Sequence, residues 1–126
     1  KQKDQTPLKE KFKRFERDGF QIYVGKNARN NDELTLKFAH KDDLWLHAKG
    51  VSGSHVVIKH KFNMTFPVHV IQYAAALAAH YSSSAGAEWV PVIYTPKKFV
   101  RKPKGFEPGQ VVMDREEVIM VEPKLP

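Results

Sequence analysis

The chain contains the stretch Asp43-Leu44-Trp45-Leu46-His47, followed after a short polar turn by Gly53-Ser54-His55-Val56-Val57-Ile58. Two β-prone runs around a glycine-containing turn predict a strand-turn-strand unit, whose second strand begins at Ser54 and His55. Because side chains alternate across a strand, the two leucines share one face, whereas the acid, the indole and the imidazole share the other. We therefore expect a core face lined by leucine and an opposite face able to contact a ligand.

Outward from this unit, the sequence predicts further strands and two helices. Strands are expected at 12–17 and 20–24 around the turn Asp18-Gly19, at 90–95, and in a closing hairpin of 111–114 and 118–121. Asn31 is expected to cap a short helix ending near His40, and Pro67 to open an alanine-rich helix over 68–81. The prediction is an α+β fold, with a mixed, mainly antiparallel sheet packed against one long Ala-rich helix plus a short helix.

Length and composition limit the classes of protein to which the chain can belong. The 126 residues suffice for one domain with a buried core, and the absence of cysteine excludes disulfides and thiolate chemistry. No apolar run approaches the roughly 20 residues of a membrane span. Segment 1–11 is polar and is expected to be a linker, which leaves 12–126 as the domain. The chain opens on Lys1 rather than methionine, which is compatible with a fragment of a longer protein.

The charge is strongly positive and unevenly distributed. Twenty-one Lys and Arg residues against 14 Asp and Glu residues give a net charge of +7, which favours a polyanionic partner, with nucleic acid ahead of a membrane. Between Phe62 and Pro96 the sole Asp, Glu, Lys or Arg residue is Glu88. This segregation predicts a neutral scaffold beside a charged working surface; the alternative is a solvated basic face that binds nothing.

Two basic segments are candidates for phosphate contacts. Residues 25–32 form an amide-rich loop before a predicted helix, where free N–H groups favour anions; the alternative is an ordinary capped turn. Residues 96–106 interleave five cations with Phe99 and Phe106. Such cations neutralise phosphates and exposed rings stack on bases, although strand alternation would equally bury either ring.

The sequence offers little for catalysis or metal binding. Six histidines are present, but neither a His-Glu-x-x-His pattern nor paired cysteines occur, so no metal site is predicted. A triad of Ser54, His47 and Asp43 is geometrically conceivable, yet nothing marks an oxyanion hole. We therefore predict no catalytic residue, no cofactor and no small-molecule substrate.

Several ordered blocks resemble the NFACT RNA-binding domain, NFACT-R, over about 12–121. The early blocks are 18–20, 24–27, 31–37, 43–47 and 53–58, and the later ones are 90–95 and 97–105. The resemblance implies the C-terminal module of RqcH-like ribosome-quality-control proteins, historically labelled fibronectin- or fibrinogen-binding. Such proteins act on large ribosomal subunits carrying stalled chains, and bacterial members recruit charged tRNA to add a C-terminal alanine tail. The resemblance further implies a cytoplasmic location, and it implies that segment 1–11 is the end of a preceding coiled coil.

The resulting hypothesis is a noncatalytic RNA-binding domain that contacts tRNA or ribosomal RNA, and the large subunit through a parent protein. Trp45, His47 and His55 would either form a contact patch or support the turn that presents it. The alternatives are a protein-interaction or adhesin-like module, an intramolecular docking domain, and an enzyme acting on modified RNA. The predicted contact residues are Lys26, Asn27, Arg29, Asn31, Lys37, Trp45, His47, Lys49, Ser54, His55, Lys97, Lys98, Arg101, Lys102 and Lys104.

Overall fold

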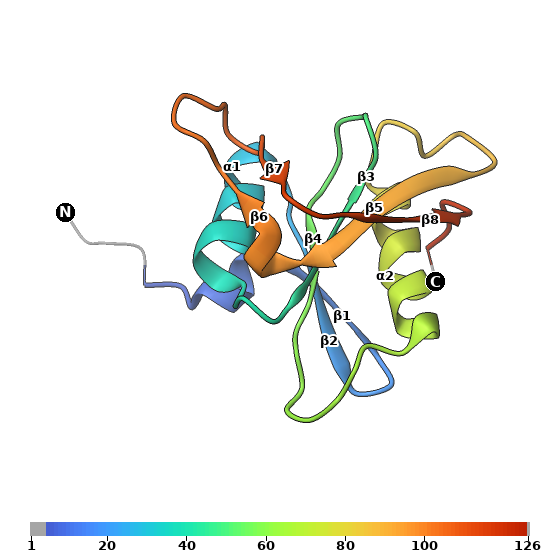
Figure 1. Ribbon diagram of the computed structural model, residues 1–126, viewed down its shortest axis with the longest axis horizontal. Helices are drawn as coiled ribbons and strands as arrows, with labels where there is room; N and C mark the ends of the chain where they lie inside the picture. The colour runs from blue at the N-terminus through green and yellow to red at the C-terminus, as the bar shows by residue number, and fades with distance from the viewer. Residues whose placement is uncertain (1–4, 126) are drawn as a thin grey trace.

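A computed structural model describes residues 5–125 as an antiparallel sheet with helices on both faces (Figure 1). The six strands lie in the order β1-β2-β4-β3-β5-β8, and every pairing among the described residues is antiparallel. The α+β class and the mainly antiparallel sheet are therefore confirmed. The strands are β1 (Lys13–Arg17), β2 (Phe20–Val24), β3 (Leu44–Ala48), β4 (Val56–Ile58), β5 (Val90–Pro96) and β8 (Glu117–Val121).

The remaining elements are two helical segments, a small ribbon and short 3-10 turns. α1 (Ala28–Asp32) continues directly into the π-helix η2 (Glu33–Phe38), and α2 (Val68–His80) has 13 residues. Because the first helical segment is nearly as long as the second, the predicted contrast of one long and one short helix is not observed. β6 (Val100–Arg101) pairs with β7 (Val112–Met113), while η1 (Leu8–Lys11) and η3 (Lys97–Phe99) are 3-10 turns.

The hairpin of β1 and β2 forms as its turn residues predict. Asp18 and Gly19 both have positive φ angles, 49° and 81°, which a two-residue hairpin turn of this kind requires. Arg17 pairs with Phe20 and Lys13 with Val24, so the register is fixed along the whole hairpin. The opposite end of β2 leads into Gly25 and the candidate site.

Strand alternation divides the core into two layers. The leucines of β3 and the isoleucines of β2 and β4 pack on α2, whose small buried alanines allow close approach to the sheet. On the other face, Trp45 packs with Tyr23, Val57 and Leu34 beneath η2. The predicted division of β3 into two faces is therefore confirmed, with Trp45 buried to 1% exposure.

The two edges of the sheet differ in character. β1 exposes Lys13, Arg14, Glu16 and Arg17, and charged side chains of this kind discourage pairing with another chain. β8, at the other edge, exposes Val118 and Met120. No helix within residues 5–125 is long and apolar enough to cross a membrane.

Three local predictions were wrong. The segments 111–114 and 118–121 do not pair with each other: β7 joins β6, whereas β8 joins β5. The second strand of the opening unit begins at Val56 rather than at Ser54. The helix cap is Asn27, because its side chain accepts the hydrogen bond from the N–H of Asn30, and Asn31 lies inside the helix.

The structure describes residues 5–11 of the predicted linker 1–11. Residues 1–4 lie outside the described part of the chain, and Leu8–Lys11 forms the 3-10 turn η1, which buries none of its residues. The boundary between a lead-in and a domain from residue 12 stays a prediction.

Candidate nucleic-acid interface

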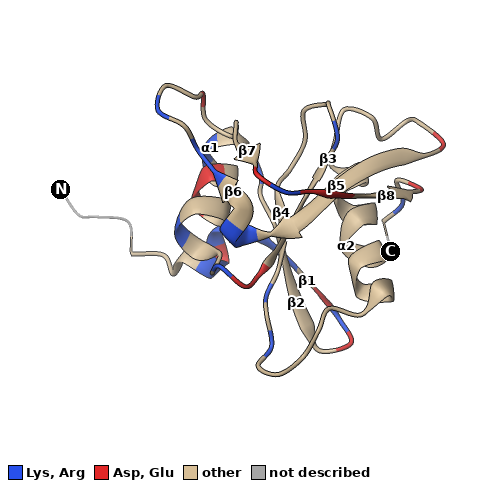
Figure 2. Ribbon diagram, viewed as in Figure 1, with Lys and Arg blue, Asp and Glu red and all other residues tan. Residues whose placement is uncertain are grey.

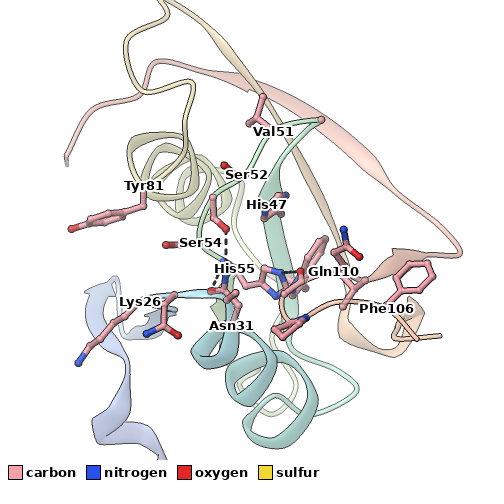
Figure 3. A pocket seen from close by; sticks show the side chains of 18 of the residues that line it. Lys26, Asn31, His47, Val51, Ser52, Ser54, His55, Tyr81, Phe106 and Gln110 are labelled. Carbon is pink, nitrogen blue, oxygen red and sulfur yellow. Dashed lines mark hydrogen bonds between the residues drawn. The ribbon is translucent and has the colours of Figure 1, made fainter. Parts of the chain in front are cut away.

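An open cleft of about 930 Å³ lies where β2, β3 and the start of α1 converge. One wall is the turn between β3 and β4, and the other is the loop that follows β6. Figure 3 shows Asn31, His47 and His55 in the middle of this cleft, with Tyr81 and Phe106 on opposite sides of the view. Its lining residues are Lys26, Asn27, Ala28, Asn31, Trp45, His47, Gly50, Val51, Ser52, Gly53, Ser54, His55, Tyr81, Phe106, Pro108, Gly109, Gln110, Val111 and Met113.

In the loop that leads into α1, asparagine side chains form hydrogen bonds with backbone N–H groups of the same segment. The side-chain oxygen of Asn27 accepts from the N–H of Asn30 at 2.9 Å, and that of Asn30 accepts from the N–H of Lys26 at 2.9 Å. Part of the predicted anion-binding capacity of this loop is therefore used internally. The side chains of Lys26 and Arg29 remain exposed, and neither forms an ion pair within the described residues.

Asn31 is buried, at 6% exposure, and links α1 to the segment 53–55. Its side-chain oxygen accepts from the backbone N–H of His55 at 3.0 Å, and its amide donates to the carbonyl of Gly53 at 3.3 Å. A Cβ atom on Gly25 would lie 1.9 Å from that same oxygen. The helix, the end of β2 and the 53–55 segment can therefore meet only because residue 25 has no side chain.

His55 connects the core to the opposite wall of the cleft. Its Nε2 lies 2.9 Å from the carbonyl oxygen of Gly109, which can only accept, so Nε2 carries the proton. Nδ1 then accepts from the hydroxyl of Thr35 at 2.7 Å, while that hydroxyl accepts from the indole N–H of Trp45 at 3.0 Å. The hydrogen bonds fix one tautomer of a neutral imidazole.

Burial keeps both cleft histidines uncharged at neutral pH. Desolvation, together with the smaller effect of the neighbouring His47, lowers the pKa of His55 from 6.5 to about 3. Desolvation also lowers the pKa of His47, against hydrogen bonds with the backbone of Gly53 and Ala48 that raise it. The His47 ring lies nearly parallel to the Trp45 indole, with 5.9 Å between centroids and 11° between planes.

The loop after β6 is anchored by Lys102 and Asp32. The ammonium of Lys102 lies 3.1 Å from the Asp32 carboxylate and also donates to the carbonyls of Glu107 and Gln110. Asp32 in turn accepts from the N–H of Gly109 at 3.0 Å. Because Gly109 has a φ angle of +82°, a side chain here would strain the backbone that receives the His55 hydrogen bond.

The structure brings together the predicted residues of the central stretch and separates most of the cations from them. Seven predicted residues line the cleft, namely Lys26, Asn27, Asn31, Trp45, His47, Ser54 and His55. Asn31, Trp45 and His55 are buried, so they can shape the cleft but cannot touch RNA without a local opening. The side chain of His47 is half-buried.

The predicted cations outside the cleft differ in how far they are already paired. Lys102 binds Asp32, Arg101 donates to Asp114 at 3.0 Å, and Lys49 lies 3.7 Å from Glu116.

The other predicted cations differ in exposure. Lys98 is exposed beside a smaller hollow that is also lined by Phe99 and Arg115. Lys37 and Lys104 are exposed, while Lys97 is half-buried. Figure 2 shows basic segments around α1 and β6 and others on β1 and in loops at both ends of the sheet, whereas α2 carries no charged segment.

Tyr81, Phe106 and Gln110 line the cleft and are not among the predicted contact residues. Tyr81 lies at the predicted end of the alanine-rich helix, and Gln110 lies in a loop without a strand or helix signal. Phe106 belongs to the basic segment, where the sequence leaves open whether its ring stacks on a base or is buried. A signal was available in the positive-φ glycines Gly105 and Gly109, which mark a shaped loop around Phe106 and Gln110.

The geometry offers no support for the triad. The Asp43 carboxylate binds Lys59 and the backbone N–H groups of His40 and His60, at the opposite end of β3 from His47. Within residues 5–125, no group of three or more His, Cys, Asp or Glu side chains is arranged to hold a metal ion. The cleft presents hydrogen-bonding and aromatic groups.

The profile of the NFACT protein RNA binding domain matches residues 11–115. The chain is 40% identical to the Rqc2 homolog RqcH of Bacillus subtilis over 98% of its own length and 21% of that protein. It is 28% identical to coiled-coil domain-containing protein 25 of Bos taurus, over 84% of this chain and 54% of that protein.

A solved structure has the same fold. It is the C-terminal part of the fibronectin/fibrinogen-binding protein of Streptococcus suis, with a TM-score of 0.83 and 40% identity. The match covers 90% of this chain and 46% of that one. The chain thus spans about a fifth of the RqcH relative that it matches in Bacillus subtilis and about half of the solved structure.

Proposed function

Because the chain belongs to the NFACT RNA-binding domain family, we propose that it is a noncatalytic module that contacts tRNA or ribosomal RNA. The observation that carries the proposal is the family match together with exposed cations beside the cleft that form no ion pair within residues 5–125, Lys26 and Arg29 above all. Exposed cations without acidic partners are the groups that replace counterions on a phosphate backbone.

The proposal extends to the parent protein through the RqcH relatives. We place the module in a cytoplasmic ribosome-quality-control factor that acts on stalled large subunits and on C-terminal alanine tailing, with the domain at 12–126. The observation behind this step is 40% identity to RqcH over nearly the whole chain. Several weak modules joined in one chain reach an overall affinity that none has alone, so modest affinity of the isolated domain agrees with the proposal.

Removing the cations next to the cleft tests the phosphate contacts. A variant with Lys26→Ala and Arg29→Ala should bind a ribosomal-RNA hairpin more weakly at low salt. Because each lost phosphate contact removes about 0.7–0.9 from the slope of log affinity against log salt, the slope should fall by about 1–2. Fluorescence anisotropy at a series of salt concentrations measures both quantities.

A matched control removes the same charge far from the cleft. Arg17→Ala with Lys61→Ala acts at the hairpin end of β2, where these side chains lie over Tyr73 and Phe20, respectively. This control should retain the wild-type salt slope within about 0.5, since neither residue is assigned a phosphate contact. Equal losses in the two variants would instead indicate a nonspecific effect of net charge.

The cations of the second basic segment, residues 96–106, should contribute unequally to RNA binding. Lys98→Ala with Lys104→Ala is expected to lower the salt slope by about 1–2, because both side chains are exposed and form no ion pair within the described residues. Arg101→Ala should have a smaller effect, since its guanidinium already donates to Asp114 at 3.0 and 3.2 Å. The same anisotropy titrations compare the variants, and an Arg101 effect equal to the double variant would contradict this ranking.

A protein-interaction module is the second candidate. The observation that favours it is the fold shared with the C-terminal part of a fibronectin/fibrinogen-binding protein. Salt separates the two candidates, because a packed protein interface withstands moderate salt better than a phosphate-dominated one. Salt-resistant binding to a protein ligand, without binding of RNA at low salt, would favour the second candidate.

A further inference from the structure

The cleft is almost uncharged, although it belongs to a domain of net charge +7. Among its lining residues, Lys26 alone carries a full charge, because burial keeps His47 and His55 neutral. A groove that tracks a phosphate backbone is lined by cations, so this cleft does not have the character of a phosphate channel. Its occupant should be an uncharged group whose anionic part stays outside.

The exposed groups of the cleft suit a flat, polar, aromatic ligand. Phe106 is 39% exposed on one wall, and His47 is half-buried between the walls with its ring backed by Trp45. The side chains of Asn27, Ser52 and Gln110 are exposed. The amide oxygens of Asn27 and Gln110 already accept from the N–H groups of Asn30 and Glu107, so the neutral groups offered to a ligand are their NH2 donors and the Ser52 hydroxyl. Unpaired RNA bases are recognised in this way, by stacking on aromatic rings and by hydrogen bonds to their edges.

The cleft also has a suitable size and a rigid frame. Its volume of about 930 Å³ falls in the range of roughly 300–1,000 Å³ found for sites that bind small organic groups. Hydrogen bonds from His55 to Gly109 and from Asn31 to Gly53 fix each wall to the buried residues at the floor of the cleft. The space between the walls therefore does not depend on a loop adopting a new position. A preformed cavity of this kind reduces the ordering cost of binding.

We propose that this cleft takes an unpaired nucleobase of the RNA, with the phosphates of the same strand held outside by Lys26 and Arg29. The inference rests on the proposed function and adds that the domain prefers single-stranded loops to continuous duplex. A base inserts its planar ring between Phe106 and His47, and its edge meets the neutral amides. A duplex keeps its bases stacked, so it reaches only the outer cations.

The test compares RNAs that differ only in accessible bases. Three ligands are used: a hairpin with an unpaired loop, the same hairpin with abasic sites in the loop, and a blunt duplex of equal charge. Wild-type domain should bind the intact loop at least about tenfold more tightly than the other two at one salt concentration, as expected for the loss of one base–aromatic stack. Equal affinity for intact and abasic loops would overturn the inference.

Protein variants locate the effect. Phe106→Ala should reduce affinity for the intact loop about tenfold, leave affinity for the duplex unchanged and retain the salt slope. Phe62→Ala is the matched control, because this phenylalanine is 86% exposed and lies outside the cleft lining. Gln110→Ala, another exposed position, should lower affinity for the loop alone.

The outcomes separate the two proposals. Salt-dependent binding without preference for the loop would leave the proposed function standing and remove the base site. Unchanged RNA affinities in Phe106→Ala and Gln110→Ala would likewise remove it and favour a peptide as the occupant of the cleft. Failure to bind any of the three RNAs at low salt would overturn both proposals.

Discussion

Gly25→Ala is expected to destabilise the domain by about 2–4 kcal/mol, through displacement of a buried hydrogen-bonding group. The new Cβ would lie 1.9 Å from the side-chain oxygen of Asn31 and 3.2 Å from its Cα. Rotating the Asn31 side chain relieves only the first contact, because the second involves the helix backbone. Movement of Asn31 would leave the N–H of His55 and the carbonyl of Gly53 without their partner.

Urea denaturation of the purified domain measures this loss, and Gly86→Ala is its matched control. A Cβ on Gly86 would meet nothing within 4 Å, so the free energy of unfolding should stay within about 0.5 kcal/mol of wild type. Both substitutions add one methyl group to a glycine, and they differ in what that methyl group meets. A Gly25→Ala protein as stable as the control would refute the role assigned to Asn31.

Acidification should destabilise the fold through His55, at up to about 1.4 kcal/mol per pH unit. The folded state holds this imidazole neutral with a pKa of about 3, whereas the unfolded chain titrates near its ordinary value of 6.5. Since the folded pKa is depressed, the stabilisation is complete above pH 6.5 and is lost as the pH falls toward 3. His47, whose pKa is also lowered, adds to the slope in the same direction.

Unfolding free energies between pH 7.5 and 5 should therefore fall more steeply for the wild type than for His55→Gln. The variant should also be less stable at pH 7.5, because the bonds to Thr35 and Gly109 change. His40→Gln, at an exposed position, should retain the wild-type slope. An NMR titration provides a test that needs no variant: His55 ring signals that shift with a midpoint near 6.5 would contradict the buried neutral state.

Local sequence rules predicted the elements whose determinants lie close together in the chain. The turn Asp18-Gly19 sets the hairpin by its own backbone preference, and the alternation in 44–47 identifies both faces of β3. Pro67 likewise marks the start of α2. In each case the residues that determine the structure are neighbours in sequence, so a pattern of a few residues is sufficient.

The errors have a common cause in long-range contacts. Asn27, Asn30 and Asn31 all suit a helix cap, and the choice falls on Asn27 because the amide of Asn31 is required by Gly53 and His55. The predicted hairpin of 111–114 and 118–121 does not form, because β7 and β8 pair with strands that lie earlier in the chain. No local pattern reveals which distant partner a short strand will choose.

For the candidate site, the sequence identified the central stretch but not its opposite wall. Trp45, His47 and His55 meet as neighbours across one turn, which their spacing suggests. The positions of Phe106 and Gln110 depend on Lys102 reaching Asp32 and on Gly109 reaching His55, contacts that no local pattern encodes. The sequence makes all five cations of segment 96–106 candidates for phosphate contacts, yet in the structure acidic partners already bind Arg101 and Lys102.

The hydrogen bonds that hold the opposite wall have a consequence for the order of events in folding. The bond from His55 to Gly109 spans 54 positions and that from Gly109 to Asp32 spans 77, so both close large loops. Loop closure of this length costs chain entropy and favours late formation, whereas the hairpin of β1 and β2 pairs locally. During synthesis, the β1–β2 hairpin and the β3–β4 pair can form before residue 109 leaves the ribosome. We expect the cleft to acquire its second wall only afterwards, so that a nascent domain would not yet bind the base that we propose for this cleft.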